Sequence, residues 1–203
     1  MYTHLMEHDM GTARRKKIIE LVKGDAYLEG DFVLSSGAKS KYYWDSKMAL
    51  TKPEALCLIA DEILEILKDI DVDAIGGLTI GAALMVPAVA LRSYQLHRPI
   101  QAFVVRDRSK EHGTKKLIEG QFPKKKGAKI VIVDDVVTTG GSIRKARDAV
   151  EEQGCRVVKV IALLDRHEGG SEDIRRDGFD FTAILHRDLI KGITVEEPLT
   201  VTV

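Results

Sequence analysis

The sequence predicts an α/β protein whose central, mostly parallel sheet is flanked by helices, and three observations support this prediction. Helical and strand-like periodicities alternate along the 203 residues without an internal repeat. Four short runs of mainly apolar residues have the composition of buried parallel strands. They are Val72–Ile75, Ile100–Val105, Ile130–Val133 and Val157–Leu164. The length and the 44% apolar content suffice for one sizeable core, so we expect a single domain over residues 1–203.

Two helices follow from periodicity and from their end signals. Thr51-Lys52-Pro53-Glu54 has the form of a capping box, and the apolar residues after it recur at helical spacing. Those residues are Leu56, Ile59, Ala60, Ile63 and Leu67. A second helix is predicted after Ser142, with Gly154 at its end. Its apolar face would comprise Ile143, Ala146, Ala149 and Val150.

Composition and charge exclude several classes of protein. Lys+Arg and Asp+Glu both count 31, so no excess charge favours nucleic acid or a membrane surface. Cys57 and Cys155 stand in apolar surroundings and are predicted to be buried thiols in a reducing compartment. No segment has the apolar length of a signal peptide core or a membrane span, so we expect a cytoplasmic protein. Residues 1–13 are expected to be partly disordered.

The segment from Ile130 to Ser142 carries the strongest chemical signal. A buried strand leads into Asp134 and Asp135, and the small-residue loop from Thr138 to Ser142 precedes a helix. Free backbone N–H groups and the helix dipole favour a phosphate at such a loop. Gly141 stands where a Walker motif has Lys, which disfavours that kind of triphosphate site. The paired carboxylates are placed to accept hydrogen bonds from vicinal hydroxyls, as a ribose 5-phosphate presents them. An ordinary strand-to-helix connection remains the alternative for the loop taken alone.

This segment resembles the phosphoribosyl pyrophosphate (PRPP) signature of the type I phosphoribosyltransferases. Their pattern is an apolar strand, two acids, two apolar residues, Thr-Thr-Gly and a small polar residue. The resemblance implies that the acids hold the ribose hydroxyls and that the loop binds the 5-phosphate. The residues carried over are Asp134, Asp135, Val136, Val137, Thr138, Thr139, Gly140, Gly141 and Ser142.

A basic segment between Arg106 and Gly120 is predicted to be a lid that folds over a polyanion. On charge alone a solvated charged hairpin is the favoured explanation of this segment. The spacing Arg-x3-Lys-x-His-Gly resembles the catalytic lid of orotate phosphoribosyltransferases, which implies that Arg106, Lys110 and His112 contact pyrophosphate. Asp107 stands where that family usually has Lys, which leaves a contact from this position in doubt.

Three further segments fit the same family. Phe32 to Asp45 resembles its N-terminal hood, in which Tyr43 and Trp44 would pack over the base, although a buried aromatic strand is an alternative. Ser35 replaces a Lys found there in some bacterial members. Asp165-Arg166-His167-Glu168 resembles the family's turn, in which Arg166 would pair with the orotate carboxylate beside Thr138, whereas His167 is expected to be an ordinary surface residue. The glycine-rich segment around Thr79 resembles the pyrophosphate loop.

The resemblance extends from about Phe32 to Gly169 and implies the type I phosphoribosyltransferase fold, with a small hood from about 14–50 plus C-terminal segments. It further implies transfer of the phosphoribosyl group of PRPP to N1 of orotate, in de novo UMP synthesis. Lys110, His112, Asp134 and Asp135 would form the catalytic group. Mg²⁺ would be held mainly by PRPP, without a direct protein ligand. A homodimer with lid residues shared between subunits is expected. Nucleic acid and membranes are not expected as binding partners. A purine phosphoribosyltransferase and a non-catalytic PRPP-sensing regulator remain alternatives.

Overall fold

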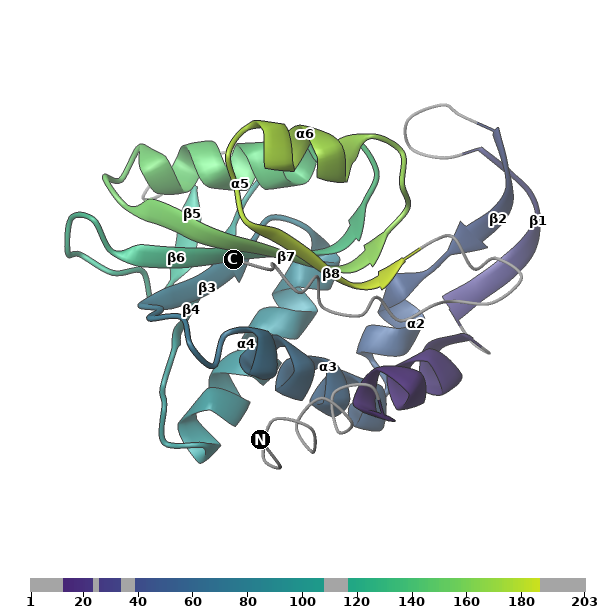
Figure 1. Ribbon diagram of the computed structural model, residues 1–203, viewed down its shortest axis with the longest axis horizontal. Coiled ribbons are helices and arrows are strands. Elements are labelled where there is room, and N and C mark those ends of the chain that lie inside the picture. Colours follow the sequence, from purple (N-terminus) through teal and green to yellow (C-terminus); the bar gives the residue numbers. More distant parts are fainter. Residues whose placement is uncertain (1–12, 24–25, 34–38, 108–116, 187–203) are drawn as a thin grey trace, which may run out of the picture.

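The centre of the molecule is a six-stranded sheet (Figure 1). The computed structural model describes residues 13–23, 26–33, 39–107 and 117–186. The strand order is β5-β4-β3-β6-β7-β8, and every neighbouring pair is parallel except β4 with β5. The strands are β3 (Ala74–Gly77), β4 (Gln101–Val105), β5 (Ile118–Gly120), β6 (Lys129–Val137), β7 (Arg156–Asp165) and β8 (Phe181–His186). The predicted α/β class with a mostly parallel sheet is confirmed.

Helices cover both faces of this sheet (Figure 1). The helical residues 13–23 lie on one face with α3 (Pro53–Ile66) and α4 (Ile80–Gln95). The other face carries α5 (Gly141–Glu151) and α6 (Gly170–Arg176). Each face has its own cluster of buried apolar side chains. The predicted apolar faces of α3 and α5 are confirmed, because all their members are buried except Leu56, which is partly buried.

An antiparallel hairpin projects beside the edge at which the parallel strands end (Figure 1). It consists of β1 (Tyr27–Val33) and β2 (Lys39–Trp44), and the short helix α2 (Ser46–Leu50) leads from it back to the body. The hairpin-like segment expected between Phe32 and Asp45 is therefore present, although its first strand begins earlier than predicted.

Two local predictions are wrong. Thr51 does not cap α3, because Pro53 occupies the first turn and makes Lys52 the N-cap, which forms no side-chain capping bond. The Thr51 hydroxyl instead donates to the carbonyl of Lys47, at the end of α2. Cys57 is exposed, since it lies on the outer side of α3, whereas Cys155 is buried as predicted.

Candidate active site at the carboxyl edge of the sheet

Two adjacent carboxylates, Asp134 and Asp135, lie near the end of β6, between β3 and β7. Asp134 is 2% exposed, whereas Asp135 is partly exposed. Thr79 Oγ1 lies 2.8 Å from Asp134 Oδ1 and 2.9 Å from Asp135 Oδ1, so its single proton serves one carboxylate at a time. The hydroxyl of Ser142 donates to Asp134, and that of Ser46 donates to Asp135. The two acids thus form a connected polar cluster at the sheet edge.

The environment of Asp134 favours its neutral form. Burial raises the pKa of this carboxyl to about 7, the negative charge of Asp135 adds to the increase, and hydrogen bonds from Ser142 and Thr79 oppose it. The net charge of the Asp134–Asp135 pair therefore changes near neutral pH, as Asp134 gains or loses its proton. A ligand that brings hydroxyl donors or a cation to this edge would favour the ionised form.

The loop from Thr138 to Ser142 connects β6 to the N-terminus of α5. Gly140 is the N-cap and has φ of 74°, a conformation that glycine adopts without steric cost. The carbonyl of Thr138 accepts a hydrogen bond from the Gly170 N–H at 2.9 Å, which ties the loop to α6. The hydroxyl of Ser142 is directed at Asp134, so its backbone N–H is the group that it can offer a phosphate. This arrangement suits an anion at the start of α5.

Val136 and Val137 support the loop rather than expose their side chains. Val137 is buried in the cluster under α5, and Val136 packs against the cluster on the other face. The carbonyl of Val137 accepts a hydrogen bond from the backbone N–H of Arg166 at 3.0 Å. This bond places the beginning of the Arg166 turn beside Thr138.

Thr79 is the N-cap of α4, where its side chain accepts a hydrogen bond from the Ala82 N–H at 3.0 Å. Helix α4 approaches the acids very closely, since a Cβ on Gly81 would lie 2.1 Å from Cγ of Asp135. Glycine at this position therefore allows the start of α4 to lie against the carboxylate. The structure brings the Thr79 loop and the acid pair together.

Arg166 lies just past the end of β7 and is 5% exposed. Its Nε is 3.0 Å from Oε1 of Glu168, a partly exposed residue of the same turn. A guanidinium held at this depth beside Thr138 is suited to bind a planar carboxylate.

Arg106 follows β4 and is exposed, with NH1 3.7 Å from Oε1 of Glu119. Asp107 is paired with Lys145 of α5 at 2.5 Å. Antiparallel pairing of β4 with β5 brings the two ends of the basic segment from Arg106 to Gly120 side by side. Lys110 and His112 lie outside the described residues.

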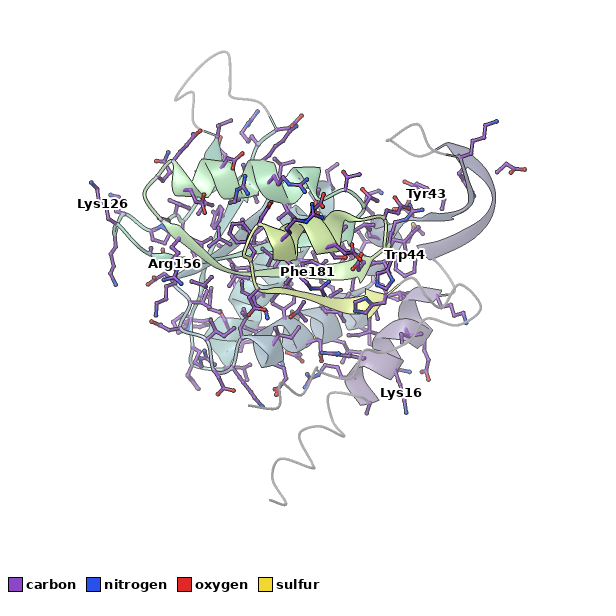
Figure 2. The ribbon with its side chains drawn as sticks, turned by 45° about the horizontal axis from the view of Figure 1, so that its top comes forward. Lys16, Tyr43, Trp44, Lys126, Arg156 and Phe181 are labelled. Atoms are coloured by element: carbon purple, nitrogen blue, oxygen red, sulfur yellow. The ribbon has the colours of Figure 1, made fainter. Side chains whose placement is uncertain are left out.

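Tyr43 and Trp44 lie where the hairpin meets the body (Figure 2). Tyr43 is partly exposed, and its ring centroid lies 5.5 Å from that of Phe32. Trp44 belongs to the main hydrophobic cluster, and its indole N–H has no hydrogen-bond partner among the described residues. Because Tyr43 is partly exposed and Trp44 is packed into the core, Tyr43 is better placed than Trp44 to contact a ligand. Lys126 and Arg156 lie at the opposite end of the sheet (Figure 2).

His167 is not the ordinary surface residue that was expected. Its Nε2 lies 3.0 Å from Nδ1 of His186, which ends β8 and is 2% exposed. Sequence inspection missed His186 because β8 was not among the predicted strands. An Asp-x-His spacing after a strand is the signal that could have marked Asp165 and His167 for attention.

No helix in the described part of the chain has the length and apolar character needed to cross a membrane.

Comparison with known proteins adds independent evidence. The family model "Phosphoribosyl transferase domain" matches residues 47–197. The orotate phosphoribosyltransferase of Rhodopseudomonas palustris (strain BisB5) is 39% identical over 175 residues, which cover 85% of this chain and 94% of that protein. The enzyme of the same name from Nostoc sp. is 44% identical over 177 residues, with 87% and 84% covered.

Solved structures agree with these relatives. The Mycobacterium tuberculosis H37Rv orotate phosphoribosyltransferase in complex with PRPP is 34% identical and has a TM-score of 0.70, with 86% of this chain and 96% of that chain covered. Adenine phosphoribosyltransferase from Leishmania donovani, a purine enzyme, is 20% identical and similar in fold alone, with a TM-score of 0.61 and with 84% and 80% covered.

Proposed function

Because the chain belongs to the phosphoribosyl transferase family, and within it to the orotate phosphoribosyltransferases, we propose which of its residues perform each part of the reaction. The enzyme transfers the phosphoribosyl group of PRPP to N1 of orotate, giving orotidine 5′-monophosphate and pyrophosphate in pyrimidine biosynthesis. The C1–O bond breaks and its electron pair leaves on the pyrophosphate oxygen. N1 of orotate supplies the electron pair of the new C1–N1 bond, and the proton of N1 passes to the leaving pyrophosphate or to solvent.

The observation that carries the assignment of residues is the acid pair beside the phosphate loop. With the 5-phosphate against the N–H groups at the start of α5, the ribose hydroxyls would reach Asp134 and Asp135. Their hydroxyl partners, Thr79 and Ser142, hold the carboxylates in place before the sugar arrives. Cleavage of the glycosidic bond develops positive charge on the ribose, which nearby carboxylates stabilise.

We assign the orotate carboxylate to Arg166, with Thr138 beside it. The charge and depth of Arg166 support this choice, because a carboxylate bound there would replace Glu168 as its partner. Tyr43 would cover the base from the hairpin. Trp44 would act mainly by fixing the base of the hairpin against the core.

The leaving pyrophosphate needs positive charge, and Arg106 at the end of β4 is placed to supply part of it. We propose that Lys110 and His112 of the lid add to it and that the lid reaches the site of a second subunit in a homodimer.

Mg²⁺ is expected with PRPP, and the carboxylate and hydroxyl oxygens around Asp134 and Asp135 fit a hard cation. The hydroxyls of Thr79, Ser142 and Ser46 already contact these acids, so we propose that the ion is held mainly by PRPP, with Asp135 as the nearer carboxylate. When bound, it would neutralise the pyrophosphate oxygens. Cys57 and Cys155 are both free thiols, which supports a cytoplasmic location.

The test is a steady-state assay with PRPP and Mg²⁺ against orotate, uracil, adenine and hypoxanthine. We expect turnover with orotate alone. Turnover of a purine base, or no turnover with any base despite PRPP binding, would contradict the proposed substrate. Asp135→Asn should lower kcat/KM for PRPP, and Asp69→Asn, at an exposed position in the turn that follows α3, is the matched control.

A further inference from the structure

A cluster of three side chains that the proposed reaction does not use lies at the ends of β7 and β8. Asp165, His167 and His186 offer one carboxylate oxygen and two imidazole nitrogens, all within 4.8 Å of one another. We propose that this cluster is a binding site for a divalent transition metal ion of the zinc type. Binding of the ion here requires neither substrate nor turnover.

The fold itself brings the three ligands together. Asp165 and His186 are register partners in the parallel pairing of β7 with β8, so their side chains leave the sheet on the same side. His167 follows two residues later and has φ of 50°, an uncommon conformation for a residue other than glycine. This left-handed turn directs the imidazole of His167 back toward His186, with their ring nitrogens 3.0 Å apart.

Two of the three separations between ligand atoms are close to those of a tetrahedral site, and the third is within 4.8 Å. Zinc–nitrogen and zinc–oxygen bonds of about 2.0–2.1 Å place neighbouring ligand atoms about 3.3 Å apart in a tetrahedron. Here His167 Nε2 lies 3.0 Å from His186 Nδ1 and 3.6 Å from Asp165 Oδ2. Shifts of a few tenths of an ångström would bring these two pairs to the ideal separation.

The state of Asp165 is a second observation that indicates a cation. Its side chain is 1% exposed, and Oδ1 accepts the backbone N–H of His167 at 2.8 Å. Oδ2 has no hydrogen-bond partner among the described residues, although it faces the imidazole of His167. A buried carboxylate oxygen in this position is costly unless a proton or a metal ion meets it.

Charge and access are compatible with an ion. The neighbouring cation, Arg166, is paired with Glu168, which limits its repulsion of a metal. The side chain of His167 is 31% exposed, so it provides a path for entry and room for a water molecule as the fourth ligand. Two imidazoles and one carboxylate favour zinc, copper, nickel or iron over magnesium.

The experiment is calorimetric titration of the full chain with Zn²⁺ in excess Mg²⁺, after treatment with a chelator. His4 and His8 are also spaced for metal binding in the sequence, so the titration uses a His4→Asn/His8→Asn background. We expect one Zn²⁺ per chain and a higher melting temperature with the ion bound.

His167→Asn should lower the affinity for Zn²⁺ at least ~100-fold, because loss of groups that merely orient a ligand already costs about 10–100-fold. The matched control is His97→Asn, since His97 has φ of 58°, is exposed and lies outside the cluster. Asp165→Asn keeps the acceptor for the His167 N–H and should also weaken binding. Absence of Zn²⁺ binding in the His4→Asn/His8→Asn protein, or unchanged binding in His167→Asn, would overturn the proposal.

Discussion

Replacement of Asp134 by Asn should make the ligand-free protein more stable at pH 8 but not at pH 4. In the unfolded chain this carboxyl ionises near its ordinary pKa of 3.8, whereas burial and Asp135 raise its pKa in the folded protein to about 7. Between these values the native state holds a proton that the unfolded state has lost. Stability therefore falls as pH rises from about 4 to about 7.

The magnitude follows from the difference between the two pKa values. The two values differ by about three pKa units, and each unit corresponds to about 1.4 kcal/mol. Ionisation of Asp134 therefore lowers the free energy of unfolding at pH 8 by at most about 4 kcal/mol. Asn keeps an acceptor for Thr79 and for the Asp135 N–H, and its amide can donate to Ser142. Because the surroundings of the charge can relax, we expect a smaller effect than this limit. The free energy of unfolding of Asp134→Asn should exceed that of the wild type by about 2 kcal/mol at pH 8 and by close to nothing at pH 4.

The measurement is urea unfolding of both proteins at pH 4, 6 and 8, with Asp69→Asn as an exposed control. When the free energy of unfolding of the wild type is subtracted from that of the variant, the contributions of the titratable groups that both proteins share cancel. A difference that does not change with pH would refute the argument. The same variant should lose activity, since a hydrogen bond to a charged group contributes about 1.5–3 kcal/mol, or roughly 10–100-fold in kcat/KM for PRPP.

Three further predictions concern the loops around the acids. Arg166→Ala should weaken orotate binding by about 2–3 kcal/mol in calorimetry, and full affinity would remove the carboxylate assignment. Gly170→Ala should raise KM for PRPP more than for orotate, because the added Cβ would lie 2.5 Å from the Thr138 carbonyl oxygen and 2.8 Å from the Gly140 nitrogen. An unchanged KM would show that the phosphate loop does not need the close approach of Gly170. Co-refolding of the Lys110→Ala and Arg166→Ala variants in equal amounts should recover roughly one quarter of wild-type activity. About half of the dimers would then be mixed, and each mixed dimer would have one intact site. No recovery in verified heterodimers would place Lys110 in its own subunit's site.

The sequence was sufficient for the sheet's central strands and for the acid pair, for a physical reason. Buried parallel strands are nearly continuous in apolar residues, and ligand groups gather where such strands end. The same logic could not locate β5, which has three residues, Ile118–Gly120, and is defined by its pairing with β4. It also missed β8, whose six residues Phe181–His186 contain Thr and end in His.

Local signals failed where a neighbouring element competed for the same residue. Thr51 has the right spacing for a cap of α3, yet the preceding helix uses its hydroxyl. The apolar neighbours of Cys57 suggested burial, but in a helix adjacent residues point in different directions. The contact of Asp134 with Thr79 and the contact between His167 and His186 depend on residues far apart in the chain, so neither could be derived from spacing.

Trp44 gives this enzyme a built-in fluorescent reporter. It is the one tryptophan in the sequence, it lies at the end of β2, and its indole is packed into the core. Two residues later, Ser46 contacts Asp135, so the emitting ring and the carboxylate are joined by a short piece of chain. Emission excited at the indole band therefore reports, without any attached dye, on the junction between the hairpin and the acid pair as PRPP is added.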